Sequence, residues 1–475
     1  MNAETLRGRA RGSPGGLLWV AVLASFTANV DLSIVNLALP TLGRAFDLSQ
    51  TQLAWAVVAY VLPYAVSILA VGRLGDRFGY GRVLVVAGLL FALGSLVAST
   101  AGAYPQLLAG RVVQGFGGSG LLTIGLALVS ANFTGAARSR GLGYYFAAGA
   151  TAAVVGPLVG GVLASTAGWP AIFWIQIPLA IAVSALCLLF VQERRGARRS
   201  LDLPGLALGS LALLGINIAL LQADTWGWTS PPIVGAWVVA VLAIGLFVVR
   251  ERTAAEPAVR LAVFRSRIYV ASVLVGGAAW FGILSGTIQL AIYLQVVRGL
   301  TPVEAALVLT PWPLIAGLLF TRAGGIVARV GPERAMLVSL ALATVAAGMM
   351  VLFDATTPLL IVSLVAALGG APIAIGVTAS TVCALAEFPP AEAGIASGVF
   401  NSLRQVGSAF GVAIPAAAFA LAAGPAISGV DAVSGSTAAF ASRLLVFAGI
   451  LLAAWLILPR EHRVTVVAGV EPPQW

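Results

Sequence analysis

Long apolar stretches, separated by short polar segments, run along the chain from residue 17 to residue 458. Each is close to the ~20 residues that an α-helix needs to cross the hydrocarbon core of a bilayer. Windows of this kind lie at 17–39, 51–71, 83–101, 105–130, 141–165, 171–191, 204–223, 232–249, 269–291, 301–320, 335–353, 358–381, 396–423 and 441–458. The pattern therefore predicts an all-α polytopic membrane protein with 14 transmembrane helices.

Composition agrees with this prediction, because charged residues make up 9% of the chain and hydrophobic residues 60%. A soluble domain would carry roughly 25% charged residues, so the lipid bilayer is the expected partner. The 27 basic residues are all arginine. A P-loop requires lysine, which excludes transport driven by ATP hydrolysis on this chain. We expect no metal site, since His462 is the single histidine and Cys187 and Cys383 lie in apolar stretches.

The distribution of arginine predicts the orientation. If the N-terminus lies in the cytoplasm, most arginines fall in cytoplasmic loops, and only Arg44, Arg298 and Arg443 fall outside. Positive loops face the cytoplasm in membrane proteins. We therefore expect a multi-pass protein of the cytoplasmic membrane with both termini inside, and the basic excess then needs no nucleic acid to explain it.

An internal repeat divides the chain. Glycines and arginines recur at the same spacing in residues 72–82 and, 252 positions later, in residues 324–334. This predicts two six-helix bundles with two inserted helices, a 6+2+6 arrangement. The expected segments are a cytoplasmic tail at 1–16, an N-terminal bundle at 17–192, a loop with the inserted helices at 193–250, a loop with the C-terminal bundle at 251–458, and a cytoplasmic tail at 459–475.

Two opposite charges lie at similar depth inside predicted helices. Asp31 lies about nine residues before the outer end of the first helix, and Arg111 about six residues after the outer start of the fourth. An unpaired charge is costly in a bilayer, so we expect these two to form an ion pair. The pair is either a static structural contact or a proton-exchange site, because burial favours the neutral acid and a nearby arginine favours the carboxylate. With no histidine in the helices, Asp31 is the candidate proton carrier.

Arg404 is a third charge inside a predicted helix, about two turns from the cytoplasmic start of the window 396–423. Its long side chain can reach the membrane interface. Alternatively, Asn401, Arg404 and Gln405, which share one helix face, line a polar cavity or clamp neighbouring helices.

The fifth predicted helix contains Gly149, Gly156, Pro157, Gly160 and Gly161. Glycines allow two helices to approach closely, and proline bends a helix. Packing alone explains the glycines. The Gly-Pro pair beside Gly-Gly predicts a bend together with a close approach.

Six segments resemble signatures of the fourteen-helix drug:proton antiporter family of the major facilitator superfamily. They lie at residues 31–40, 53–60, 72–82, 108–118, 149–161 and 401–411. The resemblance covers essentially the whole chain and implies the major facilitator fold, with two bundles around a midplane cavity that opens alternately to each side. It further implies export of small hydrophobic drugs, antibiotics or toxic metabolites in exchange for protons, with no cofactor.

The resemblance also implies roles for individual residues. Proton coupling is expected at Asp31 and Arg111. A cytoplasmic gate is expected at Gly72, Asp76, Arg77, Gly79 and Arg82, and the Gly149–Gly161 segment is expected to favour export. The substrate cavity is expected to include Asn36, Trp55, Tyr60, Gln114, Asn401, Arg404 and Gln405.

The chain departs from the family pattern at several positions. Tyr80 and Gly81 replace residues that are usually basic in the loop motif, which is expected to weaken the gate. Gln176 replaces a common asparagine without touching the Asp31–Arg111 pair. Glu304 lies at the outer edge of its helix and no second deep acid is visible. We therefore expect neutral or weakly cationic substrates, handled by a monomer.

Two other functional classes compete with export. A proton-coupled symporter that imports a small metabolite would share the fold, but it should not need the Gly156-Pro157 pattern. A membrane-embedded enzyme would need a cluster of nucleophile, base or metal ligands, and the sequence contains no such cluster. Export is the preferred interpretation, and enzymatic activity is not expected.

Overall fold

The computed structural model describes residues 13–48, 50–192, 202–254, 259, 261–389, 392–423 and 429–458. The predicted tails beyond these limits, the loop at 193–201 and the side chains of Asn36 and Pro157 lie outside the described residues. The described part contains 14 helices long and apolar enough to cross a membrane, which confirms the predicted number. The chain is a multi-pass membrane protein.

The N-terminal bundle comprises six crossings. They are α2 (Pro14–Phe46), α3 (Gln50–Phe78), α4 (Tyr80–Ser99), α5 (Tyr104–Asn132), α6 (Gly135–Thr166) and a last crossing split into α7 (Ala171–Trp174) and α8 (Gln176–Phe190). The inserted pair follows as α9 (Leu203–Trp226) and α10 (Pro231–Thr253).

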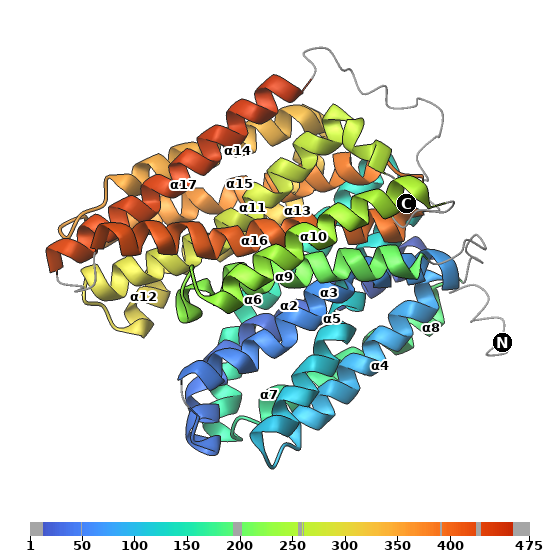
Figure 1. The fold of residues 1–475 in the computed structure, drawn as a ribbon, viewed down its shortest axis with the longest axis horizontal. Coiled ribbons are helices and arrows are strands. Elements are labelled where there is room, and N and C mark those ends of the chain that lie inside the picture. The colour runs from blue at the N-terminus through green and yellow to red at the C-terminus, as the bar shows by residue number, and fades with distance from the viewer. Residues whose placement is uncertain are drawn as a thin grey trace.

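The C-terminal bundle also comprises six crossings, preceded by a short 3₁₀ turn, η1 (Leu261–Arg265). They are α11 (Arg267–Ile292) with the π turn η2 (Tyr293–Val297), α12 (Pro302–Leu309) continued by α13 (Pro311–Val330), α14 (Pro332–Val351), α15 (Leu359–Ala386), α16 (Ala393–Ala423) and α17 (Gly429–Ile457). In Figure 1 the blue helices α2–α4 lie below the orange and red helices α14–α17.

Local sequence signals set where several helices begin. Ser13 caps α2 by accepting a hydrogen bond from the Gly16 amide, and Pro14 follows at the first helical position. A capping box between Thr301 and Glu304 starts α12. These caps satisfy amide groups that the helices themselves leave unpaired.

The two halves repeat a tight turn. Gly79 joins α3 to α4 at φ 98° and ψ 140°, and Gly331 joins α13 to α14 at φ 92° and ψ 137°. Positive φ values in this range favour glycine. The near-identical geometry supports the repeat inferred from the sequence.

The same repeat places two glycines at the contacts between the bundles. A Cβ atom on Gly72 of α3 would overlap the backbone of Gly394 in α16. A Cβ atom on Gly324 of α13 would overlap the backbone of Ser139 in α6. Both contacts lie on one side of the molecule, which we call the Pro14 face because α2 and α6 begin there and α3 and α13 end there.

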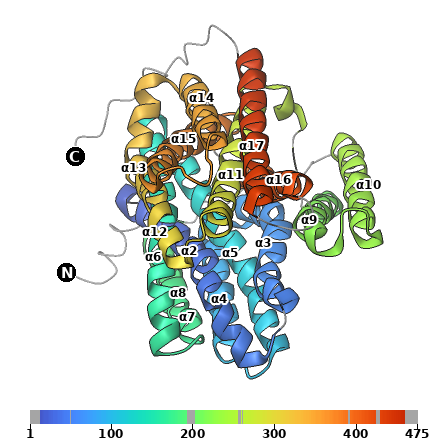
Figure 2. The same cartoon turned by 90° about the vertical axis from the view of Figure 1, so that its left-hand side faces the viewer.

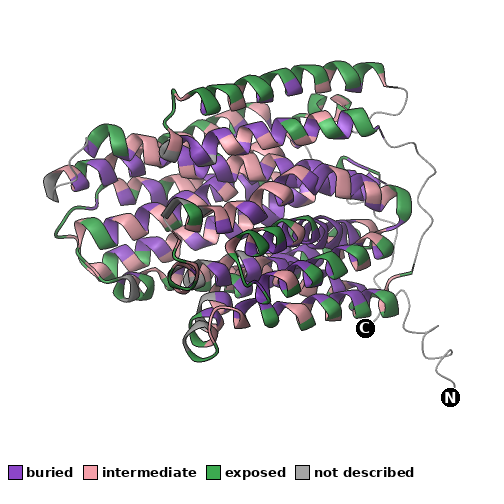
Figure 3. Cartoon of the chain, turned by 60° about the horizontal axis from the view of Figure 1, so that its bottom comes forward, coloured by how far each residue is buried: buried purple, intermediate pink, exposed green. Residues whose placement is uncertain are grey.

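The inserted helices attach to both bundles through α9. Ser210 Oγ donates a 2.7 Å hydrogen bond to the carbonyl of Val66 in α3, and Leu220 packs with Ala409 and Ala413 of α16. Figure 2 shows α9 and α10 beside α3 and α16, at the edge of the molecule. The apolar side chains on the outer surface of α10 are exposed, as expected for contact with lipid (Figure 3).

Helix α6 packs tightly on α2 through three glycines of the predicted motif. Gly149 faces Asn29, Gly156 faces Ser33, and Gly160 faces Ile34. Gly161 is exposed on the other side of the helix. Close packing therefore accounts for the first three glycines.

One helix boundary corrects the sequence analysis. The last crossing extends from Asp431 to Ile457, whereas the hydrophobicity pattern predicted 441–458. Arg443, which was expected outside the membrane, instead lies within α17 and is 5% exposed. The first turns of α17 consist of small and hydroxyl-bearing residues, which hid the helix start.

We predict that Gly156→Ala destabilises the protein and that Gly161→Ala does not. The added methyl group at 156 would collide with Ser33, whose hydroxyl is held in place by a 3.0 Å hydrogen bond to the Ala152 carbonyl. Overpacking of this kind costs about 1–3 kcal/mol. Thermal unfolding of the two purified variants measures the difference, and equal midpoints would contradict the packing argument.

Candidate transport site

Asp31 of α2 and Arg111 of α5 form the predicted ion pair. Arg111 Nη1 donates to Asp31 Oδ1 at 2.7 Å and to Oδ2 at 2.8 Å. The two side chains are 0% and 2% exposed. Arg111 Nε also donates to the carbonyl of Ala56 at 3.1 Å, so the guanidinium connects α2, α3 and α5.

A chain of hydrogen bonds extends from this pair to α4 and α8. Arg111 Nη1 donates to Gln114 Oε1 at 2.9 Å, and Gln114 Nε2 donates to Ser95 Oγ at 2.7 Å and to Gln176 Oε1 at 3.2 Å. Gln176 in turn donates to the carbonyl of Ile172. Gln176 does not touch the ion pair, but it holds the glutamine that does. The sequence analysis missed this role.

Aromatic rings enclose the guanidinium of Arg111. Its Cζ lies 4.6 Å from the ring centroid of Tyr60 and 6.0 Å from that of Phe173. Tyr60 and Gln114, both expected in the substrate cavity, are fully buried in this network. Exclusion of water strengthens the interaction between the two charges.

Arg404 of α16 lies between the two bundles among aromatic rings. Its Cζ is 4.7 Å from the ring centroid of Trp280 in α11, 5.4 Å from that of Phe146 in α6, and 5.6 Å from that of Phe400. The side chain is 6% exposed, and its Nε and Nη1 atoms have no hydrogen-bond partner among the described residues. This position between the bundles excludes the expectation that Arg404 reaches the membrane interface. It is compatible with a cavity lining and with a clamp between helices.

The other residues expected to line the cavity differ in how deeply they are buried. Asn401, one turn before Arg404, is buried, and its Nδ2 atom lacks a partner within the described ranges. Gln405 and Trp55 are half-buried. Asn36 lies in α2, but its side chain falls outside the described residues.

Asp76, at the end of α3, binds the start of α16. Its Oδ1 accepts a hydrogen bond from the Gly394 amide and its Oδ2 one from the Ile395 amide, both at 2.7 Å. A carboxylate at a helix N-terminus pairs with free amides and with the positive end of the helix dipole. Together with the Gly72–Gly394 contact, this bond joins the bundles at the Pro14 face.

Tyr80 takes part in this contact, although its replacement of a usually basic residue was expected to weaken the gate. Its hydroxyl donates to Asp76 Oδ1 at 2.7 Å and accepts from the Gly394 amide at 3.1 Å. Arg77, by contrast, is exposed and stacks at 5.2 Å on the ring of Phe78. Of these two neighbouring residues, Asp76 contacts α16 and Arg77 does so in none of the described interactions.

Arg443 is the largest omission of the sequence analysis. It lies in the interior of the C-terminal bundle, where its Nη1 donates to Met350 Sδ at 2.9 Å. Arg443 was missed because the predicted helix began only two residues before it.

The Major Facilitator Superfamily family model matches residues 21–412 of the chain. The chain is 33% identical over 419 residues to the methylenomycin A resistance protein of Streptomyces coelicolor, which covers 86% of this chain and 87% of that protein. It is 30% identical to the tetracenomycin C resistance and export protein of Streptomyces glaucescens, over 87% of this chain and 77% of that protein.

Solved structures share the fold at low sequence identity. The human organic anion transporter MFSD10 superposes with a TM-score of 0.67 and 16% identity, covering 93% of this chain and 100% of that one. The proton:xylose symporter XylE superposes with a TM-score of 0.66 and 16% identity, covering 94% and 95%. The described helices adopt the fold of these transporters, and the chain belongs to the major facilitator superfamily, among relatives that are drug-resistance and export proteins.

Proposed function

We propose that the protein exports small hydrophobic drugs, antibiotics or toxic metabolites across the cytoplasmic membrane in exchange for protons. The observation that carries the proposal is the Asp31–Arg111 pair, a carboxylate with no exposed surface whose charge is balanced inside one bundle. The names of the relatives, resistance and export proteins, support transport out of the cell.

Protonation of Asp31 provides the coupling step. A neutral acid loses the charge that attracts Arg111 Nη1, while Arg111 keeps its bonds to Ala56 and Gln114. Helix α2 is then held less firmly against α5. Since α2 packs on the glycine face of α6, and α6 contacts α13 at Gly324, a shift of α2 reaches the contact between the bundles.

We place the Pro14 face in the cytoplasm, with both termini on that side, because most arginines lie there. The Asp76–α16 bond then closes the cytoplasmic side, and its release opens the protein toward the cytoplasm. Rocking of the two bundles about their contacts follows the general behaviour of such transporters.

The charge of Arg404 bears on which substrates the protein would accept. A fixed positive charge among aromatic rings of both bundles accommodates neutral ring systems and repels cations. We therefore propose neutral hydrophobic substrates and disfavour the weakly cationic ones that the sequence also allowed. The proton gradient supplies the energy without a cofactor, and a monomer suffices, because both bundles and the gate belong to one chain.

We predict that Asp31→Asn abolishes proton coupling. Asparagine keeps the shape of the side chain but cannot exchange a proton. Substrates are first identified by comparing the drug susceptibility of strains with and without the gene, beginning with methylenomycin A and tetracenomycin C. In everted vesicles, each substrate should then dissipate a preformed proton gradient, followed with a pH-sensitive dye.

Asp47→Asn is the matched control for this experiment. Asp47 is exposed at the end of the same helix with φ 52°, a conformation that asparagine also tolerates. The control should behave like the wild type. If the proton gradient still dissipates in Asp31→Asn vesicles, the coupling proposal is wrong. If deleting the gene leaves drug susceptibility unchanged but abolishes uptake of a metabolite, the symporter is favoured.

We predict that Asp76→Ala impairs transport and lowers thermal stability, whereas Arg77→Gln leaves both near wild-type values. The alanine variant loses three hydrogen bonds to a charged group, those from the Gly394 and Ile395 amides and from the Tyr80 hydroxyl, each worth about 1.5–3 kcal/mol. Arg77 contacts only its exposed neighbour Phe78 in the described interactions. Equal loss in both variants would show that the charge of the loop, rather than the bond to α16, closes the gate.

A further inference from the structure

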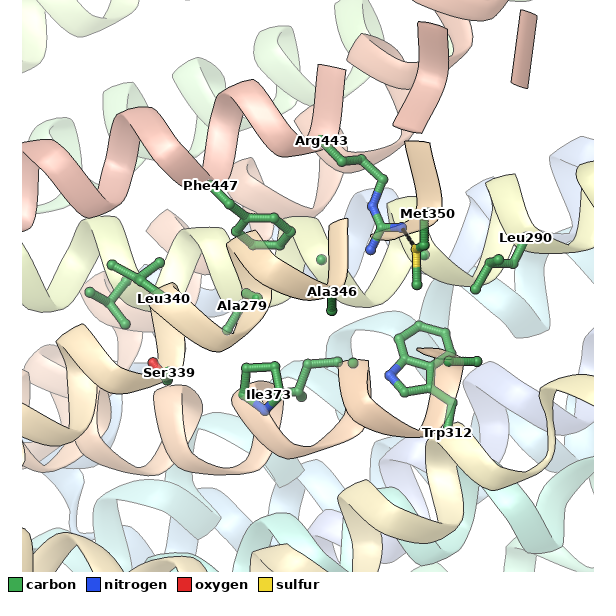
Figure 4. A pocket seen from close by; sticks show the side chains of 17 residues that line it. Ala279, Leu290, Trp312, Ser339, Leu340, Ala346, Met350, Ile373, Arg443 and Phe447 are labelled. Carbon is green, nitrogen blue, oxygen red and sulfur yellow. Dashed lines mark hydrogen bonds between the residues drawn. The ribbon is translucent and has the colours of Figure 1, made fainter. Parts of the chain in front are cut away.

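A narrow slot lies within the C-terminal bundle, apart from the Asp31–Arg111 network and from Arg404. It has a volume of about 30 Å³ and is lined by α11, α13, α14, α15 and α17. Most of its walls are apolar or small residues, among them Leu340, Ala346, Gly369 and Phe447. Figure 4 shows the guanidinium of Arg443 on one side of the slot beside Met350, with Trp312 on the other side.

Arg443 carries its charge here almost without compensation. It is 5% exposed, its Nε has no hydrogen-bond partner among the described residues, and Nη1 donates to the sulfur of Met350. A thioether is a weak acceptor and carries no negative charge. No carboxylate in the described part of the chain forms an ion pair with this guanidinium.

Deprotonation does not relieve this charge, because arginine stays protonated in proteins. A buried charge without a partner is strongly unfavourable. The glycine at 286 opens space on the slot side of the guanidinium, since a Cβ atom there would lie 3.0 Å from Arg443 Nη2 and 3.1 Å from Trp312. A larger residue at this position would therefore crowd the guanidinium and the indole ring where they border the slot.

The size and chemistry of the slot select its ligand. A volume of 30 Å³ exceeds the ~10–15 Å³ that one water needs, but it is too small for a drug-sized molecule. A divalent oxyanion would need many donors, and the walls provide few besides Arg443, the indole N–H of Trp312 and the hydroxyl of Ser339. A spherical monovalent anion requires no directional set of donors.

We propose that this slot binds one monovalent anion of the size of chloride, held by the guanidinium of Arg443. All lining residues belong to one bundle, so rocking of the two bundles against each other does not carry the site from one side of the membrane to the other. The anion is therefore a resident ligand that stabilises the C-terminal bundle and is not the transported cargo. The site does not depend on the proposed export function.

Thermal unfolding of the purified full-length protein tests the site. The midpoint is measured as chloride replaces gluconate at constant ionic strength and pH, because gluconate is too large for the slot. A ligand that binds only the folded state raises the midpoint with concentration. We expect a rise of several degrees that saturates, with bromide acting like chloride.

Arg443→Met removes the charge at similar volume and should abolish this chloride dependence. The matched control is Arg404→Met, which removes another buried arginine whose Nε and Nη1 atoms have no hydrogen-bond partner among the described residues, and which should keep the dependence. In gluconate, Arg443→Met should be at least as stable as the wild type, since it removes an uncompensated charge.

Two outcomes would overturn the proposal. If the wild-type midpoint is the same in chloride and gluconate, the slot holds water only. If Arg443→Met keeps the rise, the anion binds elsewhere. Should that variant fail to fold, bromide quenching of tryptophan fluorescence decides. Trp312→Phe must remove a saturable component of the quenching, and either its persistence in this variant or its absence from the wild type would contradict the site.

Discussion

The interior of the two helical bundles offers no bulk water to a buried charge, so a charge without a partner is costly there. Arg111 has this partner in Asp31, and the hydrogen bonds around the pair join α2, α3, α4, α5 and α8. The arrangement of the N-terminal bundle depends on this contact. In the proposed mechanism this is the bond that a proton breaks, because a neutral Asp31 would no longer balance the guanidinium. The same interaction therefore serves packing and the proposed coupling.

The two bundles meet at contacts that the internal repeat relates to each other but that differ in strength. Gly72 and Gly324 occupy equivalent positions, and each lets a helix of the other bundle approach closely. A carboxylate strengthens only the first contact, since Asp76 binds the amides at the start of α16 while Ala328 stands at the equivalent position of the second half. Hydrogen bonds and close packing therefore hold the first contact, whereas the described residues of the second contact show close packing.

The two bundles also differ in the buried charges that they contain. The N-terminal bundle holds the buried carboxylate of Asp31, paired with Arg111, together with the carboxylate of Asp76 at the end of α3. The C-terminal bundle holds Arg404 and Arg443, whose charges are fixed. Arg404 presents its charge and aromatic neighbours between the bundles, where a substrate would bind, whereas Arg443 faces a slot inside its own bundle.

The sequence by itself determined the number of crossings, the 6+2+6 repeat and the Asp31–Arg111 pair, because hydrophobic length, repeated glycines and the cost of a buried charge act locally. Only the tertiary structure decided which groups complete these features. Tyr80 joins the contact between α3 and α16 because its hydroxyl reaches the amide of Gly394, more than 300 positions later. Arg443 is buried because α17 begins at Gly429, which places this residue well inside the helix and within the C-terminal bundle. Contacts between distant helices depend on packing geometry, and no pattern along one segment encodes that geometry.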